Sequence, residues 1–107
     1  MDTALPLRTS YLMTIRVQAA IPSALGAFPL GERRFVAFTG GTFHGADDTD
    51  LHGSLADGGV DWQTVRADGA VEIRAHYLLV TDRHEHIEVQ SDGIRIFPPA
   101  VAARVAQ

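Results

Sequence analysis

The sequence predicts an all-β domain, an antiparallel β-barrel assembled from short strands. Ten glycines recur at short intervals and divide the 107-residue chain into brief segments. This punctuation is typical of β-sandwiches and barrels. Several of the segments are rich in β-branched and aromatic residues, which fit a pleated, half-buried surface. The sequence contains no internal repeat and no linker, so residues 1–107 are interpreted as a single domain.

Seven segments are predicted to be strands. In two of the connections between them, the glycines indicate how the chain turns or bends. Asp68-Gly69 in RADGAV is expected to form a type I′ turn, since glycine readily adopts the positive φ that this turn requires. The segments on either side should therefore be antiparallel neighbours. Gly40-Gly41 is expected to let the barrel bend between two strands. The predicted strands are 9–19, 32–39, 42–45, 50–56, 59–67, 70–81 and 85–96.

Alternation along two of these segments indicates which side chains share a face. In 70–81 the face expected to form the core carries Val71, Ile73, Ala75, Tyr77 and Leu79. In 59–67 one face carries Asp61, Gln63 and Val65, and the other carries Val60, Trp62 and Thr64. Neither of these faces is uniformly apolar, so the pattern leaves open which one points inward. After the last strand, Pro98-Pro99 predicts a short C-terminal helix of about two turns.

Composition restricts the chemistry available to the chain. It contains no Cys and no Lys, which excludes thiolate nucleophiles, cysteine-ligated metals and lysine Schiff bases. A net charge of −4 without a basic run argues against nucleic acid as a partner. No apolar stretch approaches the roughly 20 residues of a membrane span, and MDTALPLRTSY lacks the features of a secretion signal. We expect a cytoplasmic protein that needs no cofactor or metal.

Five sequence blocks, in fixed order, resemble the DUF3237 family, also called UPF0311. The resemblance runs from about residue 14 to the end, and it implies a calycin-like antiparallel β-barrel that is often oligomeric. It implies no reaction, since the family has no assigned activity. Analogy with lipocalin-type barrels suggests a small apolar ligand. The blocks are GERRFVAFTGGTFHG (31–45), LHGSL (51–55), GGVDWQTVRADG (58–69), AHYLLVTD (75–82) and HIEVQSDGIR (86–95).

This sequence departs from the family pattern in length and at three positions. Family members usually continue with further strands, so here an exposed sheet edge is expected. Soluble proteins avoid such edges, so either a second chain covers it or the barrel is smaller than the family's. We expect the first, in a homodimer or higher homo-oligomer. His44, His76 and Ser91 stand where the family has an acid, an Arg and an Asn, so any family chemistry at these positions is in doubt.

Asp61 and Tyr77 are the candidate catalytic residues. A carboxylate with apolar neighbours can act as a general acid or base near neutral pH, and a tyrosine hydroxyl can stabilise a developing oxyanion. The structural alternative is that Asp61 bonds backbone N–H groups at a strand end and Tyr77 only packs its ring. The residues expected to contact a substrate are Trp62, Phe43, His44 and His86. Arg33, Arg34 and Arg95 could hold a ligand carboxylate, but exposed arginines are common at strand edges, so they are expected to be solvated.

The histidines raise a separate possibility. His84 and His86 form an H-x-H pair, and with His44, His52 or His76 they could hold zinc or iron as in a cupin. The charged run DRHEHIE is more typical of a hairpin rim, so no metal is expected. Three functions stay open: a cofactor-free isomerase, lyase or cyclase, a non-catalytic ligand-binding or assembly module, and a metal-dependent cupin-like enzyme. In the first two, the barrel binds a small, partly apolar metabolite.

Overall fold

A computed structural model describes residues 6–96 of the chain as seven β-strands. No helix among these residues could cross a membrane. The helix expected over 98–107 lies outside the described residues. The strands are β1 (Met13–Ala19), β2 (Ser23–Phe28), β3 (Gly31–Gly45), β4 (His52–Leu55), β5 (Val60–Val65), β6 (Val71–Thr81) and β7 (His86–Arg95).

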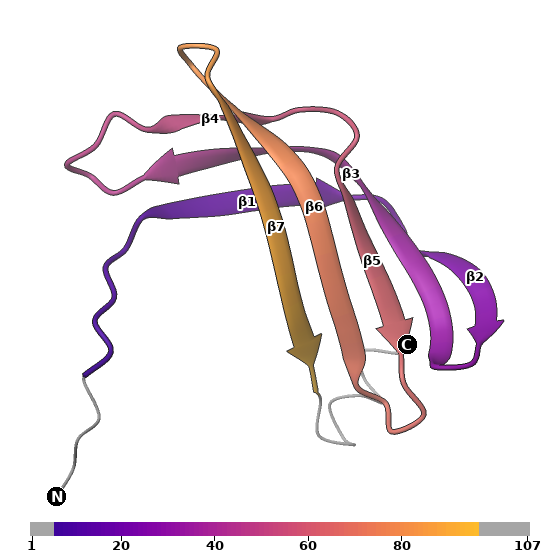
Figure 1. Cartoon of the computed structure of the whole chain (residues 1–107). Helices are drawn as coiled ribbons and strands as arrows, with labels where there is room; N and C mark the ends of the chain where they lie inside the picture. Colours follow the sequence, from indigo (N-terminus) through magenta and orange to yellow (C-terminus); the bar gives the residue numbers. More distant parts are fainter. Residues whose placement is uncertain (1–5, 97–107) are drawn as a thin grey trace, which may run out of the picture.

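All strand pairs are antiparallel, and β3 pairs with four other strands (Figure 1). The first half of β3 pairs with β2 and β5, and its second half pairs with β1 and β4. β6 pairs with β4, β5 and β7. The pairings β3–β4, β4–β6, β6–β5 and β5–β3 return to the first strand. The fold is therefore a small antiparallel β-barrel, to which β1, β2 and β7 are added.

The bend in β3 occurs at Gly40 and Gly41, where the glycine pair predicted it. The register with β1 shifts there: Gly40 pairs with Gln18, but Phe38 pairs with Ala19, which leaves Thr39 as an extra residue. A Cβ on Gly41 would collide with the Arg16 carbonyl oxygen of β1. The strand bends without ending, so the predicted segments 32–39 and 42–45 are one continuous strand.

The hairpin between β5 and β6 confirms the predicted antiparallel pair, but its predicted turn type is wrong. Only Gly69 has a positive φ, of 87°, whereas a type I′ turn needs two such residues. The Gly69 N–H donates to the Arg66 carbonyl at 3.0 Å. Asp68 instead accepts from the Ala70 N–H at 3.0 Å and from the Arg66 guanidinium at 2.7 Å. The Ala70 N–H, and after it Arg66, hold the pKa of Asp68 below its usual value.

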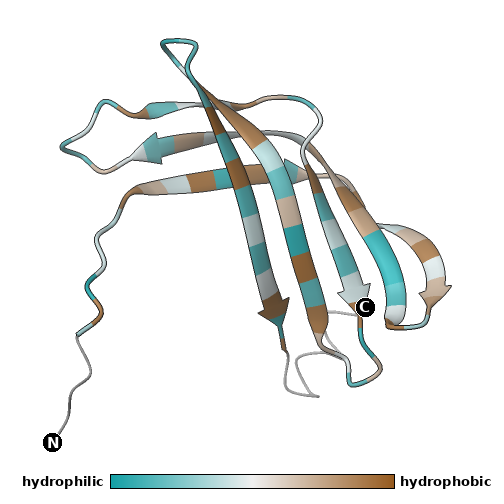
Figure 2. Cartoon of the chain, viewed as in Figure 1, coloured by the Kyte–Doolittle hydropathy of each residue, from teal (hydrophilic) through white to brown (hydrophobic). Residues whose placement is uncertain are grey.

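The core lies where β3, β4 and β6 meet. Phe43, Leu55 and Leu79 form its centre, and Leu79 has no exposed surface. The predicted inward face of β6 is confirmed, because Val71 and Ala75 on the same face are also buried. Polar and apolar positions alternate visibly along β6 (Figure 2). Partly buried residues packed around the centre are Met13, Ile15, Phe38, Leu51, Tyr77, Ile87 and Val89.

One strand, β2, was not predicted. All six of its residues are exposed, so it lacks the alternation that marks a half-buried strand. It also contains Gly26, whose φ is 106° and at which the register with β3 shifts. A glycine at such a bulge reads as a loop signal in the sequence.

Candidate functional site

The strand register decides which face of β5 points inward. Asp61 lies between Val36 of β3 and Ala75 of β6, both of which are buried. Residues opposite one another in neighbouring strands share a face of the sheet. Asp61 and Gln63 therefore point to the inner face, and Trp62, between them in the sequence, points to the outer face.

Three polar side chains form a relay on the inner face. The Arg34 Nη2 donates to the Gln63 Oε1 at 3.0 Å, and the Gln63 Nε2 donates to the Asp61 Oδ2 at 2.9 Å. Gln63 is only 5% exposed, so the guanidinium and the carboxylate are joined through a buried amide. The Arg34 Nε and the Asp61 Oδ1 are also buried, but neither has a hydrogen-bond partner among residues 6–96.

The relay lines a half-open groove of about 670 Å³. This volume lies within the range of small-molecule sites in proteins. Most of the groove wall is apolar, and it is contributed by β1, the segment after it, β3, β5, β6 and the end of β7. The lining residues are Val17, Ala19, Ala20, Pro22, Arg34, Val36, Phe38, Asp61, Gln63, Val65, Gly69, Val71, Ile73 and Arg95.

Tyr77 shares the inner face with Asp61 but lies outside the lining of this groove. Its ring packs edge-on against Phe38, with 5.4 Å between the ring centroids. Burial raises the pKa of Tyr77, and its hydroxyl forms no hydrogen bond within the described part of the chain. Tyr77 lines a separate pocket of about 310 Å³ beside Gly58 and Gly59. The two predicted catalytic residues are thus not brought into one cavity.

Trp62 lies on the outer face of the sheet. Its side chain is 40% exposed, and its ring lies 5.6 Å from that of Phe35. The Arg33 guanidinium lies 5.5 Å from the centre of the Trp62 ring and donates to the Thr64 hydroxyl at 2.7 Å. This group borders an outer groove that does not include Asp61. Trp62 therefore cannot form a wall beside Asp61 in this arrangement.

The other residues expected to contact a substrate are also apart from Asp61. Phe43 is 2% exposed and belongs to the core. His44 is exposed on β3 opposite His52, and His86 is exposed at the start of β7. None of the three lines the inner groove.

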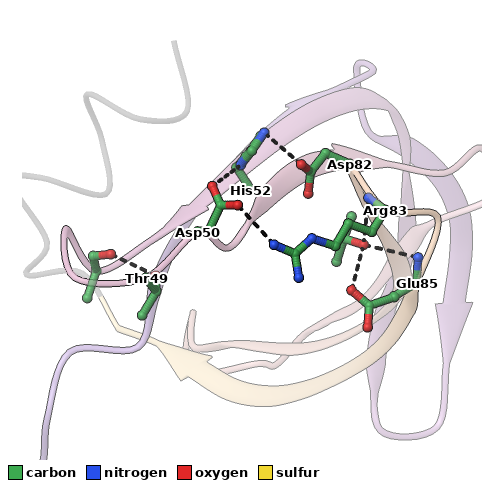
Figure 3. A network of polar contacts seen from close by, with 8 residues as sticks. Thr49, Asp50, His52, Asp82, Arg83 and Glu85 are labelled. Carbon is green, nitrogen blue, oxygen red and sulfur yellow. Dashed lines mark hydrogen bonds and ion pairs between the residues drawn. The ribbon is translucent and has the colours of Figure 1, made fainter.

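Two of the five histidines, His52 and His76, contact carboxylates on different parts of the sheet. His52 lies 3.9 Å from Asp50 and 3.5 Å from Asp82, and Arg83 donates to Asp50 at 3.1 Å (Figure 3). His76 contacts Glu88 at 2.6 Å. Within residues 6–96 no group of three or more His, Cys, Asp or Glu side chains is arranged to hold a metal ion. The contacts of His52 with Asp82 and of Arg83 with Asp50 connect the start of β4 with the β6–β7 hairpin.

Sequence reasoning missed Gln63 and misjudged Arg34. Arg34 was expected to be solvated, yet its side chain is partly buried in the inner groove. Gln63 carried one usable signal, because it lies two residues from Asp61 and so on the same face. Only the pairing of β3 with β5 brings Arg34 to this face beside Gln63.

Comparison with known proteins identifies the family. Residues 7–107 match the family described as "Protein of unknown function (DUF3237)". UPF0311 proteins from Rhodopseudomonas palustris and Bradyrhizobium diazoefficiens are 29% identical over 92 residues, which cover 86% of this chain. The chain spans 58% of the length of these relatives.

Solved structures agree with this assignment. A conserved protein of unknown function from R. palustris matches with a TM-score of 0.87 and 26% identity, over 96% of this chain and 66% of that one. A "beta-barrel like protein" from Acinetobacter baumannii matches with a TM-score of 0.68 and 29% identity, over 98% and 67% of the two chains. The chain belongs to the DUF3237 family, also known as UPF0311.

Proposed function

We propose that this protein binds a small, partly apolar organic molecule in the inner groove. The observation that carries the proposal is the polar relay of Arg34, Gln63 and Asp61 set in an otherwise apolar wall. Ligand sites combine a mainly apolar lining with a few fixed polar groups in this way. The relay would orient the ligand, while the apolar wall would supply most of the affinity.

The unpartnered atoms of the relay support the same proposal. Buried polar atoms are almost always hydrogen-bonded, and each exception calls for an explanation. Here a donor and an acceptor are both unpartnered among the described residues, and they belong to the two ends of one relay, Arg34 and Asp61. A ligand that shifts these side chains on entry could satisfy both atoms.

We expect the neutral probe 2-naphthamide to bind in the groove. We expect the probe to shift the backbone amide signals of Val36, Asp61 and Ile73, which line the groove, in a titration followed by two-dimensional ¹H–¹⁵N NMR. Residues whose side chains point to the outer face should show smaller shifts. Ala20→Phe places a ring at the groove wall and should weaken binding about tenfold. Ala27→Phe, at an exposed position of β2 outside the groove, is the matched control and should leave binding unchanged.

Cofactor-free acid–base catalysis is the second candidate, favoured by the unpartnered Oδ1 of Asp61. The Asp61 carboxylate would take a proton from the carbon next to a ligand carbonyl, leaving the electron pair in an enolate, and would then return the proton. We expect α-hydrogen exchange of 2-tetralone in D₂O to be faster with the wild-type protein than with Asp61→Asn. Equal rates for the two proteins would leave binding without catalysis.

We also propose that a second copy of the chain covers the outer edge of β7. This strand pairs with β6 over ten residues, and its other edge pairs with no strand among residues 6–96. An edge of that length invites pairing with another chain. Light scattering coupled to size-exclusion chromatography should give twice the monomer mass at micromolar concentration, and a monomer mass would contradict the proposal.

The location of the protein in the cytoplasm stays a prediction.

A further inference from the structure

The inner groove contains a cation that no carboxylate contacts directly among residues 6–96. Its ionisable lining residues are Arg34, Arg95 and Asp61, and the Arg34 guanidinium donates to the neutral Gln63 amide. We propose that the ligand is a small organic monoanion with an apolar body, held at its charged end by Arg34. This inference rests on the proposed binding function and adds the chemical class of the ligand.

Within residues 6–96, Arg34 makes no direct contact with an acid. No carboxylate lies within ion-pair distance of its guanidinium in the described part of the chain, and its observed partner is the neutral Gln63 amide. Asp61 is reached only across that amide. A guanidinium has five N–H donors in a planar fork that matches a carboxylate. Because Arg34 is partly buried, its attraction for an anion is screened less than at the surface.

Comparison with the neighbouring arginines shows that Arg34 is set apart. Arg66 forms an ion pair with Asp68 at 2.7 Å, and Arg74 forms one with Asp92 at 3.2 Å. Arg33 lies on the outer face against Trp62 and Thr64. Arg34 alone among these four is partly buried, lines the inner groove and has no contacting acid among the described residues.

The relay also favours one orientation of the ligand in the groove. Gln63 presents its oxygen to Arg34 and its nitrogen to Asp61, so the cationic and anionic ends of the groove are fixed relative to each other. An anionic group is attracted to the Arg34 end and repelled from the Asp61 end. A ligand with one negative charge and an apolar body along Val36, Val65 and Ile73 satisfies both conditions, whereas a dianion spanning the groove would not.

The test compares 2-naphthoate with 2-naphthamide, which share a ring system and differ in charge. We expect 2-naphthoate to bind the wild-type protein about tenfold more tightly, since charge-assisted hydrogen bonds are about twice as strong as neutral ones. Arg34→Gln should remove this preference, because neither probe then meets a positive charge at that end of the groove. Arg34→Lys, which keeps the charge, should retain part of it. Arg33→Gln removes an equal charge from the adjacent residue on the outer face and should retain the full preference.

The outcomes separate this inference from the proposed function. Equal affinities for the two probes, or equal loss in Arg33→Gln and Arg34→Gln, would overturn the monoanion assignment and leave groove binding intact. Binding of neither probe would overturn groove binding itself. Circular dichroism of each variant should match that of the wild type. If Arg34→Gln fails to fold, Arg34→Lys decides the question, because complete loss of the preference in that folded variant would contradict a role for the charge.

Discussion

Leu79→Ala is expected to lower the free energy of unfolding by about 2–5 kcal/mol, the usual cost of a cavity in a closely packed core. Leu79 has no exposed surface and packs against Phe43 and Leu55. The lost side chain leaves space that these neighbours, held on β3 and β4, can fill only in part. Urea unfolding followed by tryptophan fluorescence measures the effect.

The matched control is Leu30→Ala, because Leu30 is 84% exposed between β2 and β3. Surface substitutions of this kind change stability by at most about 0.5 kcal/mol. Similar losses in Leu30→Ala and Leu79→Ala would show that the core is not centred where β3, β4 and β6 meet.

Gly53→Ala should destabilise the protein by about 1–3 kcal/mol, the usual cost of forcing extra atoms into a packed site. The added methyl group would collide with the Val80 carbonyl oxygen of β6 and lie 2.9 Å from the Phe43 ring. The backbone cannot move aside without disturbing the pairing of β4 with β6, which spans only three residue pairs. Thermal unfolding should show a lower midpoint.

Gly93→Ala tests whether that loss comes from the collision. Gly93 is also a strand glycine, but a Cβ there meets no atom within 4 Å, and its φ lies outside the left-handed region. The added methyl group therefore creates no clash, and it reduces the entropy of the unfolded chain. An unchanged or slightly higher unfolding midpoint is expected. A loss as large as that in Gly53→Ala would attribute both effects to glycine replacement in general.

Local sequence features predicted much of the architecture. Glycine punctuation and β-branched residues located six of the seven strands to within a few residues at most ends. Alternation in β6 identified the core face that contains Leu79, and Asp68-Gly69 identified a hairpin. These features depend on neighbours in the chain, and such information is present in a single sequence.

The candidate site depends on pairings between distant segments and was predicted less well. Asp61 was singled out, but its connection to Arg34 exists only because residues 32–37 pair with residues 60–65. The inward face of β5 was undecidable because both faces mix polar and apolar residues: Val65 shares a face with Asp61 and Gln63, and Thr64 shares the other with Val60 and Trp62. Trp62 was placed beside Asp61 in function since they are adjacent in sequence, yet adjacent strand residues point to opposite faces.

The bent strand β3 also has a kinetic consequence. It pairs with β1, β2, β4 and β5. Neither the segment before β3 nor the segment after it can therefore complete the hydrogen bonds of β3 without the other. Joining residues 32–37 to residues 60–65 requires a loop to close before the contacts stabilise it. Chains dominated by such distant pairings refold in milliseconds to seconds. We therefore expect a single cooperative refolding phase in that range, limited by the docking of β5 onto β3.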